Sequence, residues 1–273
     1  MFNIIIKTIF GKILNYISLA AAYVRLNWLS HIEYRGAFFL EAAGMFFNNL
    51  IWLGFWTYFF KAFPAVPSWK STDVITLWAV AAAGFGLAFV ICGNCRVLAS
   101  IIAKGELDTW LLYPRHLLSH FLLGKMKPSA FGDMVFGFVT YLLFVKPDLP
   151  HIFLFGILTV SVAILFIAFS IIVGSLSFFL GNAESLATHW EESLITFSLY
   201  PAPLFEGRIR IVLYTVVPAL FVSYYPIEAL RSLSLTYTLY AFAGSLVLSI
   251  VAVIVFYVGL KRYESGNLTA MRG

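Results

Sequence analysis

Charged residues are scarce in this chain: only 11% of its 273 residues are Asp, Glu, Lys or Arg, whereas 61% are apolar and 18% are aromatic. A water-soluble domain of this length could not bury so much apolar surface in one core. The apolar runs also lack the alternation with polar residues that is typical of barrel strands, so we interpret them as helices. The sequence therefore excludes a soluble fold and predicts an all-α integral membrane protein.

Cysteine and histidine are too few or too scattered to predict redox or metal chemistry. The two cysteines, Cys92 and Cys95, form a C-x-x-C spacing, but no soluble strand-to-helix junction accompanies them and a zinc site needs four ligands. We interpret them as small buried thiols at the end of a span. The five histidines form no ligand cluster, so we expect no metal site and no cofactor in this chain.

The sequence also lacks a phosphate-binding loop. The segments "FGKIL" and "LGKMK" contain Gly-Lys, but neither has the upstream glycine or the following hydroxyl residue of G-x-x-x-x-G-K-[ST]. No segment between the apolar runs is long enough for a catalytic or nucleotide-binding domain. We therefore expect that this chain is not itself an enzyme and does not hydrolyse ATP by P-loop chemistry.

Five apolar segments are long enough to cross a bilayer, since about 20 helical residues span roughly 30 Å of hydrocarbon. They are residues 36–60, 74–95, 128–146, 152–180 and 236–260. We predict a sixth span over 183–205 and a re-entrant segment over 206–231, where Pro218 and Pro226 suit backbone that enters the membrane and returns. Gly84 and Gly86, in the second span, are expected to permit close helix packing.

The charge distribution supports six spans. The net charge of +5 comes from basic residues near predicted membrane ends, which is typical of cytoplasmic loops and gives no reason to expect a nucleic-acid partner. Six crossings place most lysines and arginines on one side, whereas a seventh would leave Lys261 and Arg262 outside. We predict a multi-pass protein of a plasma or bacterial inner membrane, with both termini cytoplasmic.

The N-terminal residues 1–35 are expected to form an amphipathic helix on the inner membrane surface, leading into a six-span bundle over 36–273 within one transmembrane domain, 1–273. Isoleucines recur at helical spacing in residues 5–17, while Lys7 lies on another side. A retained signal anchor remains the alternative, because Lys7 and Lys12 interrupt the apolar stretch that a cleaved signal peptide would need.

One polar segment interrupts the chain between the second and third spans: "KGELDTWLLYPRHLLSHFLLGKMK", residues 104–127. Leu107, Trp110 and Leu111 recur at helical spacing beside Glu106 and Asp108, and Pro114 follows as a stop signal. The pattern predicts a short amphipathic helix with an acidic edge. An interfacial helix with a solvated charged face is the simpler alternative.

The order of parts resembles the membrane subunit of a type-two ABC exporter, in the branch whose ATPase is a separate chain. The resemblance rests on "YRGAFFLEAAGMFFNNLIW", "KGELDTWLLYPRHLLSHFLLGK", "YPAPLFEGRIRIVLYTVVPALFVSYYPIEALR" and "GLKRYESGN". It covers nearly the whole chain, and "GELDTWLLYPR" and "GLKRYESGN" are its more specific parts.

The resemblance implies a coupling helix in the loop after the second span, which docks on the ATPase. It also implies two ATPase subunits, which bind ATP and Mg²⁺, and a second permease, identical or related to this chain. The coupling residues would be Glu106, Leu107, Asp108, Trp110, Leu111 and Tyr113, with both acids facing the partner and Trp110 and Leu111 anchoring the helix.

Ionisable residues within spans are functional candidates because they are costly to bury in lipid. Glu41 and Asp133 lie near the inner ends of their spans, next to Arg35 and Lys127 respectively, and are expected to be structural. A polar stripe in the fifth span is a candidate for the mouth of a translocation pathway between two permeases, favouring cationic or amphipathic cargo. Its residues are Glu184, Thr188, Glu191, Glu192 and Thr196; solvation at the inner boundary is the alternative.

Two other classes remain open from the sequence. An ion-coupled secondary transporter of small amphipathic or cationic molecules would need acids near the middle of the membrane, whereas the acids here lie near its inner boundary. A membrane enzyme acting on lipid would need clustered acid–base or metal-binding residues at an interface. Membrane lipid is in any case an expected partner.

Overall fold

The computed structural model describes residues 18–31, 33–62, 69–113 and 116–263. All the regular elements in these ranges are helices, so the chain is an all-α integral membrane protein. Five helical segments are long and apolar enough to cross a membrane, close to the five predicted ones. They are α2 (Arg35–Ala62), α3 (Ser71–Ile91), α7 (Pro128–Thr140) with its continuation to Val145, α8 (Leu149–Gly174) with α9 (Ser177–Leu180), and α14 (Leu235–Leu260).

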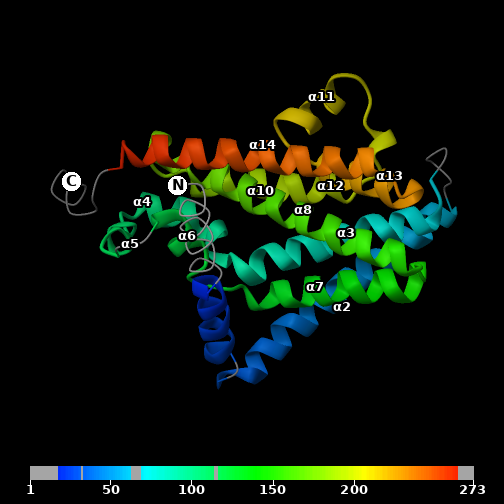
Figure 1. The fold of residues 1–273 in the computed structure, drawn as a ribbon, viewed down its shortest axis with the longest axis horizontal. Coiled ribbons are helices and arrows are strands. Elements are labelled where there is room, and N and C mark those ends of the chain that lie inside the picture. The colour runs from blue at the N-terminus through cyan, green and yellow to red at the C-terminus, as the bar shows by residue number, and fades with distance from the viewer. Residues whose placement is uncertain (1–17, 32, 63–68, 114–115, 264–273) are drawn as a thin grey trace, which may run out of the picture.

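Helix α3 is the centre of the bundle. In its most apolar window 78% of the residues are buried, compared with 22% in α2 and 28% in α14. It packs against α7 and α8, while α14 and α2 form opposite edges of the bundle (Figure 1). The exposed apolar side chains of α2 and α14 are therefore available to lipid, and α3 forms the interior of the bundle.

Glycines bring α3 close to its neighbours, as the sequence predicted for Gly84 and Gly86. A Cβ on Gly84 would overlap Val162 of α8, and one on Gly86 would overlap the backbone of Met134 in α7. Gly137 of α7 in turn lies against the backbone of α3, where an added Cβ would come within 2.5 Å of the Ala79 carbonyl oxygen. The absence of side chains at these positions sets the α3–α7 and α3–α8 distances.

The predicted sixth span over 183–205 is only partly right. Helix α10 (Glu184–Ser198) has 15 residues and ends before Pro201, so it is shorter than a single spanning helix. The chain nevertheless continues along the bundle, because the Tyr200 ring lies 5.0 Å from the Trp56 ring near the C-terminal end of α2. Proline at 201 explains why the last part of this passage is not α-helical.

The segment before α14 is broken, as predicted. Helix α11 (Gly207–Thr215) is followed by α12 (Leu220–Ser223) and α13 (Tyr225–Ser232), with a bend of 85° between α11 and the segment Leu220–Ser232. If this bent pair counts as one crossing, the number of spans rises from five to six. Figure 1 shows α11 outside the bundle, beyond α14.

At the opposite end of the bundle, short helices fill the loop between α3 and α7. They are the 3-10 helix η1 (Gly93–Val97), α4 (Leu98–Ala103), α5 (Asp108–Leu111) and α6 (Leu117–Leu122). Residues 18–31 form a helix that runs across the long axis of the molecule (Figure 1), and Asn27 Nδ2 donates a hydrogen bond to the Leu123 carbonyl. This direction fits the predicted interfacial helix; residues 1–17 lie outside the described residues.

Candidate functional site

The loop between α3 and α7 is tied at both ends to the end of α3. The Gly93 amide donates to the Lys125 carbonyl at 2.9 Å, and the Lys127 amide donates to the Phe89 carbonyl at 2.9 Å. Asn94 Nδ2 adds a buried hydrogen bond to the Phe121 carbonyl at 2.7 Å. The approach is close, since a Cβ at Gly93 would lie 2.8 Å from the Lys125 carbonyl oxygen. The loop therefore begins and ends on one rigid element.

Within the loop, α4 ends at Ala103. Gly105 follows it with a positive φ of 71°, which lets the Glu106 amide donate a hydrogen bond back to the Ile101 carbonyl. The chain then enters α5, which contains four residues and is shorter than the predicted helix. Leu107 is completely buried, in a hydrophobic cluster that includes residues near the ends of α8 and α14. The loop is thus a folded extension of the bundle.

The six expected coupling residues divide into an inner and an outer set. Trp110 packs edge-on against Phe121 at 5.3 Å and, with Leu107, holds α5 to the bundle. Leu111, expected to be an anchor, is instead 47% exposed, so Leu107 takes the anchoring position. Tyr113 is also exposed, as is Leu112, which is 84% accessible.

The two acids of this segment have different surroundings. Glu106 is exposed. Asp108 is half-buried and interacts with Tyr263, which follows α14, so it is engaged within this chain and does not simply face outward. Burial is the main reason why the pKa of Tyr263 rises to about 12. The exposed part of the segment therefore consists of Glu106, Leu111, Leu112 and Tyr113, which we call the α5 patch.

One ion pair connects η1, the short helix that follows α3, with α10. The Nε atom of Arg96, in η1, donates to Oε2 of Glu191 at 2.9 Å, and the two side chains are 21% and 8% exposed. The guanidinium carbon also lies 5.6 Å from the ring centroids of Phe85 and Phe89. The pair is therefore held in a mostly apolar environment, where each charge depends on the other.

Two cavities meet at this ion pair. A vestibule of about 490 Å³ lies at the loop end of the bundle, and its lining includes Lys125, Thr188 and Glu191. An inner cavity of about 180 Å³ lies among α2, α3, α7, α8 and α10. Arg96 and Lys127 line both cavities, so these two cations separate them. Burial is the main reason why the pKa of Lys127 is lowered, and the positive charge of the nearby Arg96 lowers this pKa further.

Asp133 is buried at the inner cavity and is only 3% exposed. Asn49 Nδ2 of α2 donates to its Oδ1 atom at 2.6 Å, while Oδ2 has no hydrogen-bond partner among the described residues. The sequence predicted a structural acid beside Lys127, and the interaction between α2 and α7 through Asn49 is consistent with that role. Glu41 is exposed on α2.

The five expected pathway residues on α10 do not share one environment. Thr188 and Glu191 line the vestibule, and Glu191 is buried. Glu184, Glu192 and Thr196 are exposed on α10, where Glu192 lies 3.7 Å from the ring of His189. The structure thus brings one acid against Arg96 and leaves two acids on the surface of the protomer.

Sequence reasoning missed two partners at this site. Arg96 was not singled out among the basic residues, although a lone arginine directly after a predicted span must find an anion or water. Asn49 was overlooked, although an amide in the middle of an apolar span is itself a signal of helix–helix hydrogen bonding. Cys92 and Cys95 are buried free thiols, as predicted, and the described residues contain no group of side chains that could hold a metal ion.

Comparison with known proteins identifies one family. The family model described as "ABC-2 family transporter protein" matches residues 46–267, which is more than half of the chain. No curated protein and no solved structure gives a significant match. The matched residues include the loop between α3 and α7, the whole of α10 and the bent segment before α14.

Proposed function

Because the chain belongs to the ABC-2 family of transporter membrane proteins, we propose that it is the permease subunit of an ATP-driven exporter whose ATPase is a separate chain. Two copies of the ATPase and a second permease, identical or related to this chain, complete the assembly. The ATPase binds ATP and Mg²⁺ and hydrolyses the nucleotide. This chain supplies the pathway through the membrane.

The observation that carries the proposal is the double attachment of the loop to the end of α3. A force applied to the loop reaches α3 through the Gly93–Lys125 and Phe89–Lys127 backbone hydrogen bonds. It reaches α10 through the Arg96–Glu191 ion pair. Closure of an ATPase dimer against the loop would therefore move the most buried helix and the candidate pathway helix together.

The α5 patch is the proposed docking surface for the ATPase. Leu112 projects from it with 84% of its side chain accessible, flanked by Tyr113 at 55% and Leu111 at 47%. Glu106 supplies a negative charge beside these apolar side chains. Such a combination suits a cleft with an apolar floor and a basic rim, because apolar anchors supply affinity and charge supplies orientation.

Helix α10 is the proposed wall of the pathway. Its exposed polar residues, Glu184, Glu192 and Thr196, lie on the surface of the protomer and are available to a space shared with a second permease. Two exposed carboxylates there favour cationic or amphipathic cargo. Glu191 has a different task in this proposal: it receives the movement of α3 through Arg96.

We also assign the loop end of the bundle to the cytoplasmic side. The loop, the vestibule and the end of α14 lie on the cytoplasmic side of a plasma or bacterial inner membrane, where the ATPase and its nucleotide are. The excess of lysine and arginine on this side supports the assignment. Both termini are cytoplasmic in this topology.

Purification of the tagged chain from its native membrane in mild detergent, followed by mass spectrometry, tests the assembly. We expect a P-loop ATPase in the purified sample, and a second permease-like chain if the pair is heteromeric. Glu106→Arg and Leu112→Asp should each reduce ATPase recovery by about tenfold, equivalent to about 1.4 kcal/mol of binding free energy. Glu33→Arg, at another exposed acid, is the control and should leave recovery unchanged.

Two results would contradict the proposal. Undiminished ATPase recovery with both α5-patch variants would exclude docking at this surface. Recovery of this chain alone, under conditions that keep other ABC complexes intact, would exclude a stably bound separate ATPase.

The cargo assignment has its own test. Glu184→Gln and Glu192→Gln should each slow export of a cationic amphipathic dye from inverted vesicles that contain the whole complex, while ATP hydrolysis continues. Thr188 belongs to the same helix but lines the vestibule, so Thr188→Ala tests whether a polar side chain there also contributes to export. Unchanged export with both glutamine variants would exclude a cargo role for these acids.

A further inference from the structure

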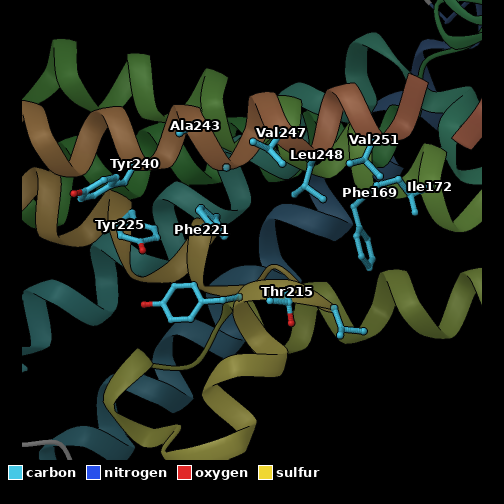
Figure 2. Close-up of a pocket in the computed structure, with 13 residues that line it drawn as sticks. Phe169, Ile172, Thr215, Phe221, Tyr225, Tyr240, Ala243, Val247, Leu248 and Val251 are labelled. Atoms are coloured by element: carbon cyan, nitrogen blue, oxygen red, sulfur yellow. The ribbon is translucent and has the colours of Figure 1, made fainter. Parts of the chain in front are cut away.

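A long groove lies between α14 and the bent segment before it. It has a volume of about 620 Å³ and is walled by α8, α11, α12, α13 and α14 (Figure 2). Its size falls within the range of about 300–1,000 Å³ that is usual for ligand sites. It is separate from the vestibule and the inner cavity, since its lining residues are different.

The groove opens on the lipid-facing side of the bundle. Val247 and Val251 of α14 line it and are 59% and 39% exposed, and neighbouring apolar residues of the same helix are exposed as well. From Tyr240 to Val251 the groove follows α14 for 11 helical steps, which is about 16 Å at 1.5 Å per step. This length matches one leaflet of a hydrocarbon layer that is roughly 30 Å thick.

The groove changes character along its length. Tyr214, Tyr225 and Tyr240 gather at the end where α14 begins, with the Tyr225 ring 5.9 Å from the Tyr214 ring and 5.6 Å from the Tyr240 ring. Figure 2 shows Tyr225 next to Tyr240. Beyond them the walls are aliphatic or phenyl side chains as far as Phe169 and Val251, except for Thr215, whose hydroxyl donates to the Ile211 carbonyl. One end therefore offers several hydroxyl groups and the other mainly apolar surface.

A cation lies beside the tyrosine end, just outside the residues that line the groove. The guanidinium carbon of Arg210 is 5.7 Å from the ring centroid of Tyr224, the residue next to Tyr225. Arg210 is exposed and has no carboxylate within ion-pair distance among the described residues. None of the described residues that line the groove is acidic. Glu228 lies near Tyr224, but its charge is paired with Arg231 at 2.7 Å. The polar end is therefore complementary to an anion and the remainder to a hydrocarbon chain.

We propose that this groove binds a phospholipid from the leaflet opposite the loop, with an acyl chain along α14 and the phosphate between Arg210 and the tyrosine hydroxyls. Arginine and hydroxyl groups are suitable partners for a phosphate. The location on a lipid-facing helix and the one-leaflet length both favour a membrane lipid over a water-soluble ligand. The site is independent of ATP and of the ATPase.

The shape of the groove depends on Gly244. A Cβ added there would overlap the ring of Phe221, so the ring lies directly against the α14 backbone. Phe221 in turn contacts Tyr225, with the ring centroids 5.1 Å apart. Because residue 244 is a glycine, the bent segment packs directly on α14 at the tyrosine end of the groove. Further along the groove, α14 and the bent segment lie farther apart.

Photo-crosslinking of the full chain tests the proposal. The protein is placed in phosphatidylcholine nanodiscs that contain a trace of phosphatidylglycerol with a diazirine on its acyl chain, illuminated, and digested for mass spectrometry. We expect lipid adducts on α14 between Tyr240 and Val251, and on α11 to α13, at about tenfold higher yield than on the exposed face of α2 around Ile51.

Two matched pairs of variants sharpen the test. Val247→Trp fills the groove, whereas Val253→Trp places the same side chain on an exposed position of α14 outside it. Val247→Trp should lower the adduct yield about tenfold and Val253→Trp should not. Arg210→Gln should lower the yield with phosphatidylglycerol, while Arg208→Gln, an exposed neighbour on α11, should have a smaller effect.

Several outcomes would overturn the proposal. Adducts in the groove that are no more frequent than on α2 would mean ordinary lipid contact. Equal yields for the two tryptophan variants would exclude the groove as the binding site. Crosslinks from the groove to a second protein chain in place of lipid would show that another subunit covers it. A size-exclusion profile like that of the unmodified protein establishes that each variant is folded.

Discussion

The Arg96 guanidinium donates a 2.9 Å hydrogen bond from Nε to Oε2 of Glu191, joining η1 to α10 across 95 positions of sequence. It is the point at which the vestibule and the inner cavity meet, because Arg96 lines both. The two side chains are mostly shielded from water. Removing either partner therefore leaves the other charge without compensation.

Glu191→Gln and Arg96→Gln should each lower the free energy of unfolding by about 3 kcal/mol, since breaking a buried ion pair leaves one charge unpaired. The exchange Arg96→Glu with Glu191→Arg should recover part of the loss. Thermal unfolding of these proteins, and of the single variants Arg96→Glu and Glu191→Arg, in the same nanodiscs measures the coupling. A loss in the exchanged pair equal to the sum of the Arg96→Glu and Glu191→Arg losses would mean that the two charges do not stabilise each other.

Asn49 and Asp133 should respond asymmetrically to substitution. Asn49→Leu removes the donor of the 2.6 Å hydrogen bond to a buried carboxylate, which should cost about 1–3 kcal/mol. Asp133→Asn removes the buried charge but keeps an acceptor for Asn49, so its stability should stay within about 1 kcal/mol of the original. Chemical unfolding followed by tryptophan fluorescence checks both. An equal loss in both variants would show that the carboxylate charge itself stabilises the bundle.

Gly137 of α7 packs against α3, whereas Gly44 of α2 has no close neighbour, so these two glycines form a matched pair for testing the packing of α3. An added methyl group at Gly137 would overlap the α3 backbone, so Gly137→Ala should cost about 1–3 kcal/mol by overpacking. Gly44 of α2 has nothing within 4 Å of its added Cβ, so Gly44→Ala should have no such cost. Thermal unfolding midpoints compare the two. Similar midpoints would mean that the α3–α7 contact adjusts without strain.

Cys92 and Cys95 should resist alkylation in the folded protein. Burial raises the pKa of the Cys95 thiol well above its ordinary value, with Cys92 as a further cause, and only the thiolate reacts. Because the folded-state pKa is raised, the thiolate fraction stays small at pH 7–8. Maleimide labelling should be much slower than in a Leu112→Cys variant, whose introduced thiol is exposed. Equally fast labelling of the native thiols would contradict their burial.

Much of the fold was predictable because lipid imposes a simple requirement on sequence. The five long spans follow from apolar length alone, and the broken segment follows from prolines within an apolar run. The end of α10 at Ser198 was not predicted, since a polar stripe with a nearby proline does not say whether the chain continues as helix. Helix α5 was also predicted to be longer than its four residues.

The candidate site was less predictable for a physical reason. The α5 segment, Glu191 and Asp133 could be selected individually, because charges in an apolar chain are conspicuous. Their partners, Arg96 and Asn49, come from other helices, and hydropathy carries no information about which helices are neighbours. Hydropathy could not find the groove beside α14 either, since its lining has the composition of an ordinary lipid-facing surface.

The central position of α3 also constrains the order of membrane insertion. Helix α2 exposes most of its surface and is suited to lipid on its own, whereas α3 is covered by α7 and α8, which the ribosome makes later. A nascent chain that ends before Pro128 therefore has α3 in the membrane without these two neighbours. Stable burial of α3 must wait until Gly137 of α7 and Val162 of α8 arrive, so the first half of this protein depends on the second half for its assembly.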